Sequence, residues 1–585
     1  MRKKSVIIGS IAIGLLITLL IGIQLFVAFW IKPVLDAVFK ESVSYYSSGL
    51  YKVTYSNMGI HPFQQTVTFK EFQLTFDSAR VEQEDSLKSR KWVSANVGDF
   101  ELGLGNFWRM IPQRYLLVEE LNIKSPHLTI YDYSSNKVKK KKDTVNLDKI
   151  QQFDAHALIE EYFDSLDVEQ LNINDANIKW VNRVEEQLPF NLGDINANIR
   201  KLHVDSSTVN RNYGYPYAKE FVLKVENSSF TTPDSLYTFK LGMVQADPVA
   251  EQLIVERFSV EPQKSLYQFA RDIGHQADRI NLNVARLDME QIDLHYLVSD
   301  LAFLVGKITI EDADLSVFKD KRLPEAPQET KPMVQEAIMN IPIPFRLDTL
   351  QLKRGHIEYQ EQIEDAREPG TITFEELYMS AYRITNLDSL RAQNLEVDVQ
   401  TRFMGKSTMD IHFNFPLNSP NNQHYIQAEM YEMPLQSMNV MLENTAFASI
   451  ESGYAYAVKF NISANEKSSS GDMHFAYKDL KIALINKDNP DDPKLKEVVG
   501  SILANAFVVK TDNPSSNSQP LRIGKINFER DPNKSVFSYW WKSLLSGMKG
   551  SMGLRDEIPG ANSEASKGDE KKGFFKRLFK KDSSE

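Results

Sequence analysis

Residues that could perform catalysis are scattered along this chain of 585 residues and form no familiar catalytic motif. The chain has no cysteine, which excludes thiolate nucleophiles, thiolate metal sites and disulfides. It also lacks the G-x-S-x-G motif of serine hydrolases and the H-E-x-x-H motif of zinc proteases. The ten histidines, among them His356, His412, His424 and His474, do not have the spacing of metal ligands. We therefore expect a protein that is not an enzyme and that binds no metal and no cofactor.

The segment Gly405-Lys-Ser-Thr408 imitates the end of a phosphate-binding loop. That loop requires a glycine five residues before Gly405, where this chain has Gln400, and a helix after the motif. No helical pattern follows, so the sequence does not support a nucleotide site. An alternating pattern predicts a single strand through the motif instead, formed by Phe403, Gly405, Ser407, Met409, Ile411, Phe413 and Phe415.

An uncharged apolar stretch runs from Val6 to Ile31. At about 1.5 Å per helical residue it exceeds the hydrocarbon core of about 30 Å, and it is longer than the apolar core of a signal peptide. Pro33 suits the end of that helix. The basic residues Arg2, Lys3 and Lys4 keep the N-terminus in the cytoplasm under the positive-inside rule. The sequence favours an uncleaved anchor over a signal peptide, with Val6, Leu16, Trp30 and Ile31 in the anchor and Trp30 at the interface.

From Tyr51 onward the apolar residues alternate with polar ones, as in Tyr51, Val53 and Tyr55. Such alternation predicts half-buried strands of an antiparallel sheet, separated by a few helices near residues 36–50, 147–166, 265–278, 331–340 and 494–507. About 500 residues at about 20 per strand and turn give roughly 25 strands and about 120 Å of sheet. The predicted fold is mainly β with a few helices, as an elongated, curved antiparallel sheet. Its region spans 33–555, with sub-boundaries near 134–150 and 320–345, after an anchor at 1–32.

A repeated phrase occurs four times in this region. It reads apolar, any, apolar, two polar, a small residue or proline, any, apolar, any, apolar. Two short strands joined by a turn or a bulge explain the pattern, because a small residue or proline tolerates a bend. Uneven spacing between the copies excludes a solenoid of fixed period. The copies are Leu121–Ile130, Leu171–Trp180, Ile308–Val317 and Leu350–Tyr359.

A sheet must bury its apolar face against something. Closed β-sandwiches and an open trough lined by Leu, Ile, Val and Phe give the same alternation, so the pattern alone does not distinguish them. The predicted length is unusual for a compact core and natural for a trough that holds acyl chains. The candidate lining residues come from the four phrases: Ile123, Leu128, Ile173, Ile178, Ile310, Leu315, Leu352 and Ile357.

Two basic segments stand apart from the sheet. Lys137–Lys142 is interpreted as a solvated loop, or as a contact with anionic lipid headgroups. The tail at 556–585 has a disordered composition and ends in a basic amphipathic segment. That segment either docks on a membrane or partner or only solubilises the tail. Its membrane-surface candidates are Phe574, Phe575, Lys576, Arg577, Leu578 and Phe579.

The net charge of −10 argues against nucleic acid as a partner. The arrangement resembles the AsmA-like family of bacterial envelope proteins, relatives of TamB and of repeating-β-groove lipid-transfer proteins. The resemblance rests on the anchor followed by Tyr51–Tyr55, on the phrase Leu121–Leu128, and on Arg530–Gly547, which is similar to the closing strand and helix of such proteins. It covers most of residues 1–553 in architecture.

The resemblance implies a single-pass protein of the bacterial inner membrane with most of its chain in the periplasm. Its partners would be phospholipid, the inner membrane and other envelope proteins, and its function would be phospholipid transport between the two membranes and outer-membrane maintenance. No catalytic residues belong to such a family, so none are assigned. The alternative is an envelope scaffold or assembly factor that acts through protein contacts without carrying lipid, whereas an enzyme would need a polar cleft that the sequence does not indicate.

Overall fold

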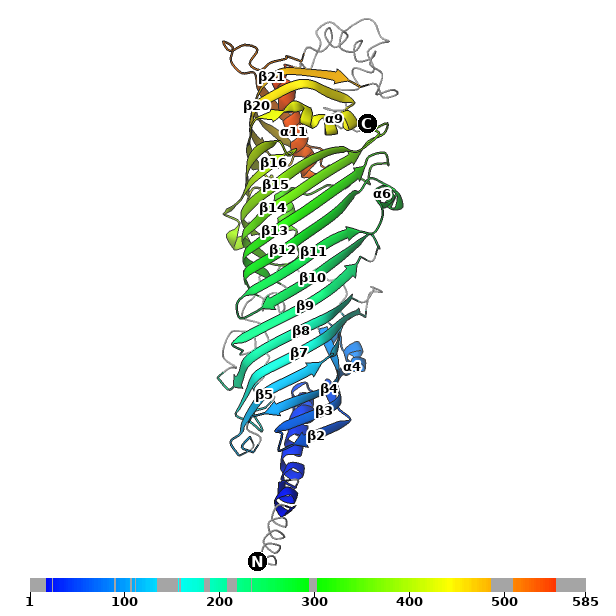
Figure 1. Cartoon of the computed structure of the whole chain (residues 1–585), viewed down its shortest axis with the longest axis vertical. Helices are drawn as coiled ribbons and strands as arrows, with labels where there is room; N and C mark the ends of the chain where they lie inside the picture. Colours follow the sequence, from blue (N-terminus) through cyan, green and yellow to red (C-terminus); the bar gives the residue numbers. More distant parts are fainter. Residues whose placement is uncertain are drawn as a thin grey trace, which may run out of the picture. The chain divides into compact units, whose positions relative to one another are not determined.

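The protein is described by a computed structural model that covers residues 17–23, 25–88, 91–105, 108–110, 112–133, 156, 159–183, 190–207, 218–232, 234–293, 302–485 and 509–553. Across these residues the chain is mainly β, and 22 strands belong to one mixed sheet (Figure 1). The basic segment 137–142, the predicted helix 494–507 and the tail 556–585 lie outside the described residues, as does most of the predicted helix 147–166.

The chain divides into two compact units. Unit 1 comprises Met1–Pro233, Lys240–Val255 and Asp293–Asp300, and unit 2 comprises Asp234–Phe239, Glu256–Ile292 and Leu301–Glu585. The strands β10 (Tyr237–Asp247) and β11 (Gln252–Pro262) contribute to both. Each unit is described by itself below.

Unit 1 contains a helical segment followed by strands. The segment consists of η1 (Val27–Ile31), α2 (Lys32–Asp36), η2 (Ala37–Ser42) and α3 (Val43–Tyr46). Two short helices, α4 (Ser78–Gln83) and α5 (Asp85–Lys88), connect β3 to β4. The strands are β1 (Tyr51–Thr54), β2 (Asn57–His61), β3 (Thr66–Phe76), β4 (Lys91–Leu104), β5 (Tyr115–Lys124), β6 (His127–Asp132), β7 (Ser165–Asn182), β8 (Phe190–Asp205) and β9 (Glu220–Thr231).

Unit 2 contains the longer strands and the C-terminal helix. Its helices are α6 (Gln268–Ile273), α8 (Val334–Met339), η4 (Asp388–Leu390), η5 (Leu435–Met438), α9 (Asn439–Thr445) and α11 (Val536–Ser551). Of these, α6 and α8 confirm the helices predicted near 265–278 and 331–340. The strands are β12 (Asp278–Ile292), β13 (Phe303–Asp320), β14 (Phe345–Gln362), β15 (Gly370–Thr385), β16 (Asn394–Phe403), β17 (Ser407–Pro416), β18 (His424–Met430), β19 (Met433–Pro434), β20 (Ala448–Ala464), β21 (Ser468–Leu484) and β22 (Ile523–Glu529).

The prediction of a purely antiparallel sheet is wrong at two places. Strands β5 and β6 run parallel to β7, and β13 runs parallel to β14. Each parallel pairing joins two copies of the repeated phrase in register, so that Ile123 lies beside Ile173 and Ile310 beside Leu352. Parallel neighbours need a crossover connection, which residues 133–164 and 321–344 supply. Alternation alone could not reveal this, because it is the same in both pairing directions.

The bend in the repeated phrase has a defined position. The residue just before the small residue or proline has a positive φ in all four copies: 48° at Ser125, 54° at Asp175, 53° at Asp312 and 57° at Arg354. A single left-handed residue interrupts the alternation, so the apolar residues on both sides of it share one face. This explains why the phrase places two polar residues in succession at its centre.

The segment predicted as one strand around Gly405 is a hairpin. Strand β16 ends at Phe403 and β17 begins at Ser407, with Arg402 paired to Thr408. Met404 and Gly405 have φ values of 52° and 63°, so both adopt the left-handed conformation within the three-residue turn 404–406. Glycine suits that conformation, which the regular alternation on both sides conceals.

The N-terminal helical segment continues through Pro33, which was expected to end a helix. The helix widens into the π-helical stretch η1 directly before Pro33 and into a second one, η2, after Asp36. A widened turn accommodates the missing N–H and the bulk of a proline ring. Within the part of the chain that the structure describes, no helix is long and apolar enough to cross a membrane.

The left-handed residue Asp312 gives a direct test of the parity argument. Deleting Asp312 forces half of β13 to shift by one residue, which turns its apolar side chains to the polar face. Because each such side chain stabilises a fold by about 1.5–3 kcal/mol when buried, we expect a loss of several kcal/mol in the free energy of unfolding, measured with urea.

The matched control is Asp312→Gly, which keeps a residue at this position and favours its positive φ. It removes only the exposed pair with Arg354, whose two N···O distances are 2.7 and 3.0 Å. Such surface pairs contribute about 0–1 kcal/mol. Equal losses for the deletion and the substitution would contradict the parity argument.

Candidate functional site: a continuous apolar face

The central feature of unit 2 is a row of apolar side chains that crosses ten hydrogen-bonded strands. We call it the apolar row. One residue comes from each strand, and each is the register partner of the next. The row consists of Leu287, Ile310, Leu352, Met379, Val399, Ile411, Ala428, Phe460, Met473 and Gly524.

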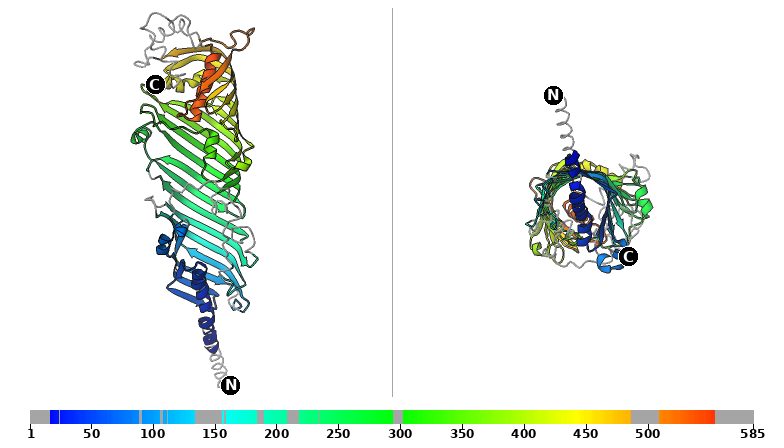
Figure 2. Two further views of the ribbon diagram at one scale, coloured as in Figure 1. Left: turned by 180° about the vertical axis from the view of Figure 1, so that it is seen from behind. Right: turned by 90° about the horizontal axis from the view of Figure 1, so that it is seen from below.

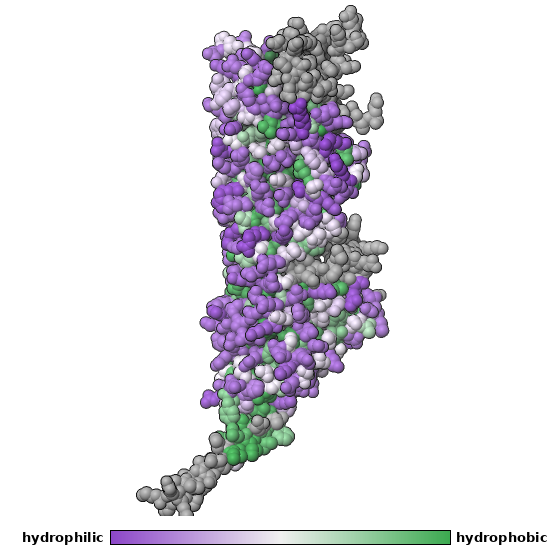
Figure 3. Space-filling model, turned by 45° about the vertical axis from the view of Figure 1, so that its right-hand side comes forward, coloured by the Kyte–Doolittle hydropathy of each residue, from purple (hydrophilic) through white to green (hydrophobic). Residues whose placement is uncertain are grey.

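The adjacent row, one residue along each strand, is polar throughout. We call it the polar row, and it lies on the opposite face of the sheet because side chains alternate. It consists of Asp288, Thr309, Gln351, Ser380, Asp398, His412, Gln427, Asn461, Asp472 and Lys525. The space-filling view shows a mainly hydrophilic surface over the strands (Figure 3).

Burial changes along the apolar row. The residues from Leu287 to Ile411 are partly exposed, whereas Ala428, Phe460 and Met473 are buried. The side chains of Leu352, Met379, Val399 and Ile411, with their chain neighbours on β14, β15 and β16, line a hollow of about 330 Å³. The apolar face is therefore accessible over the first six strands of the row and covered over the last strands.

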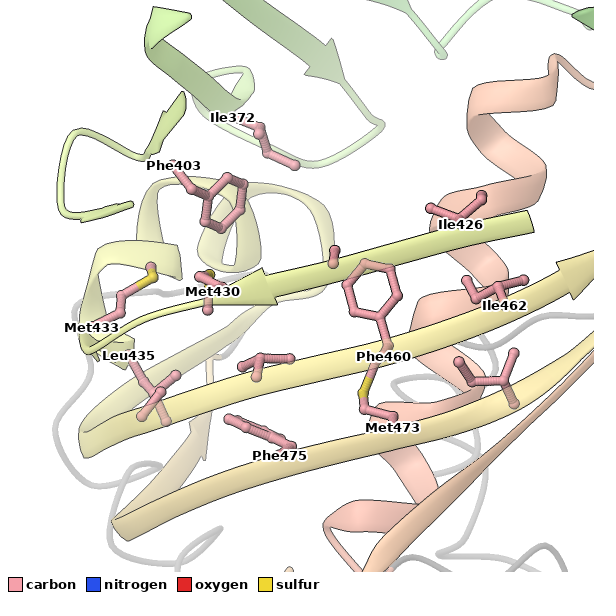
Figure 4. Close-up of a cluster of buried hydrophobic side chains, with 14 of the residues drawn as sticks. Ile372, Phe403, Ile426, Met430, Met433, Leu435, Phe460, Ile462, Met473 and Phe475 are labelled. Carbon is pink, nitrogen blue, oxygen red and sulfur yellow. The ribbon is translucent and has the colours of Figure 1, made fainter. Parts of the chain in front are cut away.

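The covered part is a hydrophobic cluster formed by side chains of β15, β16, β18, β20 and β21 (Figure 4). Phe403, Phe460 and Phe475 contribute rings, and η5 and α9 contribute Leu435 and Met441. A second cluster beside it seats α8 through Val334, Ile338 and Met339 on Ala381, Leu395 and Phe415. The helices of unit 2 thus supply a partial second layer.

Helix α11 closes the last strands by an unusually tight contact. It presents small residues to the sheet, and Ser543, Gly547 and Ser551 are buried. A Cβ atom at position 524 would lie 1.8 Å from the carbonyl oxygen of Gly547, so Gly524 permits the backbones of β22 and α11 to meet. Ser546 adds a hydrogen bond from the backbone N–H of Asn527 to its Oγ, over 3.1 Å.

The buried His424 fixes α11 to β18. The indole Nε1–H of Trp540 donates to His424 Nε2 at 2.9 Å, and His424 Nδ1 lies 2.9 Å from the carbonyl oxygen of Asn422. Since an indole N–H only donates, Nε2 is the acceptor, and Nδ1 carries the proton of a neutral imidazole. Burial lowers the pKa of His424, and the positive charge of Arg530 acts in the same direction.

Unit 1 contains an equivalent arrangement. Its apolar face carries a row of register partners across seven strands: Met58, Phe69, Phe100, Ile123, Ile173, Ala197 and Leu223. On the opposite face, Asn172 links two neighbouring asparagines: it donates to Asn122 at 2.8 Å and accepts from Asn198 at 2.6 Å. Met58 and Phe69 are buried, while Phe100, Ile123 and Ile173 are partly exposed.

The structure brings the eight predicted lining residues together in pairs. Ile123 lies beside Ile173, Leu128 beside Ile178, Ile310 beside Leu352, and Leu315 beside Ile357. All eight are partly exposed. Their alternation and register place them on the apolar face of their own unit.

The residues predicted for the anchor are placed differently from one another. Val6, Leu16 and the side chain of Trp30 lie outside the described part of the structure. Ile31 is fully buried, in a cluster with Leu35 of α2 and with Val67 and Phe69 of β3. It therefore contacts the sheet of unit 1 and not a lipid chain. The membrane-surface candidates Phe574 to Phe579 lie beyond the described residues.

The remaining histidines of interest lie on the polar face. His412 Nδ1 is 2.7 Å from a carboxylate oxygen of Asp398, and His356 Nδ1 is 3.1 Å from one of Asp314. Among the described residues, no group of three or more His, Asp or Glu side chains could hold a metal ion. The comparison of the sequence with protein-family models and with curated proteins finds no match in either.

Two contacts were not foreseen from the sequence. One is the Trp540–His424 hydrogen bond, and no local signal marks it, because the partners are 116 residues apart. The other is the tight seating of α11. Ser543, Gly547 and Ser551 recur every four residues, and this spacing of small residues on one helix face was a usable signal.

The state of His424 predicts a pH dependence of stability. Its pKa is lowered in the folded protein, so unfolding takes up a proton between the folded pKa and about 6.5, the ordinary value. The stabilisation by neutral His424 is complete above about pH 6.5 and is lost as the pH falls toward the folded pKa. We expect the urea midpoint of unit 2 to decrease from pH 7.5 to pH 5.

The substitution His424→Gln keeps an acceptor for Trp540 and removes the titration, so it should flatten this pH dependence. Gln427→Asn, on the exposed polar face, changes no titratable group, serves as the control and should leave the slope unchanged. A slope that survives in His424→Gln would show that another group is responsible.

Proposed function

We propose that this protein is a non-enzymatic, membrane-anchored carrier of lipid acyl chains, which assists phospholipid transport between the inner and outer membranes of a bacterial envelope. The observation that carries the proposal is the apolar row, which is partly exposed from Leu287 to Ile411 while the opposite face is polar. Apolar surface withdrawn from water contributes about 25 cal/mol per Å². An acyl chain along the row would remove both its own surface and that of the sheet from water.

The direction of the row suits such a ligand. The row is perpendicular to the strands, so an extended chain meets one apolar side chain about every 4.8 Å. Polar headgroups have no partners on this face and would stay at its margin in water. The resemblance of the N-terminal segment and of residues 530–547 to AsmA-like proteins supports the same function.

The anchor completes the proposal. The buried contacts of the helical segment begin at Phe26 and Val27. The exposed apolar residues Leu19, Ile21 and Leu25 precede them, and Figure 3 shows hydrophobic residues gathered here. We place the membrane span at residues 6–25, whose 20 residues reach about 30 Å as a helix. The anchor would hold unit 1 at the inner membrane, on its periplasmic side.

A photo-crosslinking experiment tests the function directly. A photoreactive amino acid replaces Met379 on the apolar row, or His412 on the polar row, in the full-length chain expressed in a bacterium with radiolabelled phospholipid. We expect a phospholipid adduct at position 379 and none at 412, because the two rows lie on opposite faces. Equal labelling at both positions, or none at 379, would overturn the proposal.

A matched pair of substitutions gives the magnitude. Val399→Asp places a carboxylate on the apolar row, and Gln427→Asp places one on the polar row of the other face. A loss of about 1.4 kcal/mol or more in lipid affinity at position 399 corresponds to about tenfold less bound lipid in the purified protein. Gln427→Asp should bind as much lipid as the unmodified chain.

The scaffold alternative predicts the opposite outcome. Envelope integrity would then survive Val399→Asp and be lost on deletion of residues 571–581. Measuring detergent sensitivity of cells that carry each variant distinguishes the two functions.

A further inference from the structure

The helical segment of unit 1 occupies part of the face that a lipid would need. Phe26, Val27 and Ile31 pack in one cluster with Phe69 and Leu102 of β3 and β4. Figure 2 shows this segment (blue) running along the first strands of the unit. Phe26 also stacks on Trp108, with ring centroids 6.3 Å apart. The helix is therefore an internal occupant of the apolar face beside the membrane span.

The occupied part continues directly into the accessible part. Phe69 is fully buried beneath the helical segment, and its register partner Phe100 is partly exposed. Ile123 and Ile173 follow in the same row and are also partly exposed. A lipid chain that entered from the membrane end would reach Ile123 only through the space that Phe26, Val27 and Ile31 fill.

A polar contact holds the helical segment in this place. The phenol of Tyr55, just after β1, donates a hydrogen bond to the Asp36 carboxylate at the end of α2. Lys40 lies 3.1 Å from the same carboxylate, and its ammonium group lies 4.1 Å from the centroid of the Tyr55 ring. These three residues form one closed set, which we call the latch. It joins the helix to the strand that begins the sheet.

The helix on either side of the latch departs from regular α geometry. Stretch η1 covers Val27–Ile31 and η2 covers Ala37–Ser42, and both are π-helical. Such stretches are rare, and they often occur at functional sites. The short α2 between them carries the buried Leu35 and the latch residue Asp36.

We propose that residues 26–46 are a gate that closes the membrane end of the apolar face, held shut by the Asp36–Tyr55–Lys40 latch and opened by displacement of α2. This gate rests on the proposed function, because it controls the loading of the same face. When the gate is closed, Ile31 and Leu35 take the place of acyl chains. When α2 is displaced, the entering chain covers Val67 and Phe69 in their stead.

The gate is tested by the rate of lipid loading. The full-length chain, with a photoreactive residue at Ile123, is reconstituted in vesicles of phosphatidylethanolamine and phosphatidylglycerol, and adducts are followed in time. Tyr55→Phe keeps the ring and removes the donor of the latch, so adducts should form several-fold faster. Tyr425→Phe, which alters an exposed tyrosine of β18 in unit 2, is the matched control and should not change the rate.

A locked variant provides the opposite test. The chain has no cysteine, so Asp36→Cys with Tyr55→Cys gives a single pair of thiols that a short bis-maleimide can bridge. Bridging should reduce adduct formation at position 123 to background. The same pair treated with a monofunctional maleimide has lost the latch but is not locked, and it should load at least as fast as Tyr55→Phe.

The outcomes separate the gate from the function. Adducts at position 123 with the same rate in the bridged, Tyr55→Phe and unmodified chains would overturn the gate and leave the carrier function standing. Absence of adducts at both 123 and 379 in every variant would overturn the carrier function itself. Thermal unfolding of each variant excludes loss of fold as the cause, and Asp36→Asn replaces Tyr55→Phe if the latter does not fold.

Discussion

The alternation of side chains across a β-strand is the constraint on which this structure depends. Each strand must deliver its apolar residues to one face, and an error of a single residue turns them all to the other. Single left-handed residues interrupt the alternation within the repeated phrases. The two faces still stay separate, because the apolar pattern of the sequence is interrupted at the same positions as the backbone. The phrase places two polar residues in succession at its centre because one of them has a positive φ. This residue is Ser125, Asp175, Asp312 or Arg354 in the four copies.

In both units, helices cover part of the apolar face of the sheet. A sheet with one apolar face needs a second layer, yet in each unit the described helices cover only part of that face. In unit 1 the cover is the N-terminal helical segment, through Ile31 and Leu35. In unit 2 it consists mainly of short helices and of α11, whose contact depends on Gly524 and Gly547. The uncovered residues, such as Leu352 and Val399, remain partly exposed.

Much of this could be predicted from the sequence. The strands, the repeated phrase and the apolar lining residues follow from period-two alternation, which is a local property of the chain. The parallel pairings of β7 and β14 could not be predicted, because alternation does not record the direction of a neighbour. The turn 404–406 was hidden in the same way, since a three-residue turn between the paired Phe403 and Ser407 leaves the alternation unbroken. The burial of Ile31 was not predicted, because an apolar helix has the same sequence pattern whether it faces lipid or packs on a sheet.

The in-register pairing of the phrases has a consequence for how such a chain can change its length. An inserted hairpin adds two strands, restores the direction of the chain and extends the apolar row by about 10 Å without turning any existing residue. A single inserted strand would reverse every pairing after it unless a new crossover came with it. The number of strands in such a face is therefore expected to change in steps of two. The exceptions are the two parallel pairings, at β7 and β14, where a crossover connection joins neighbouring strands.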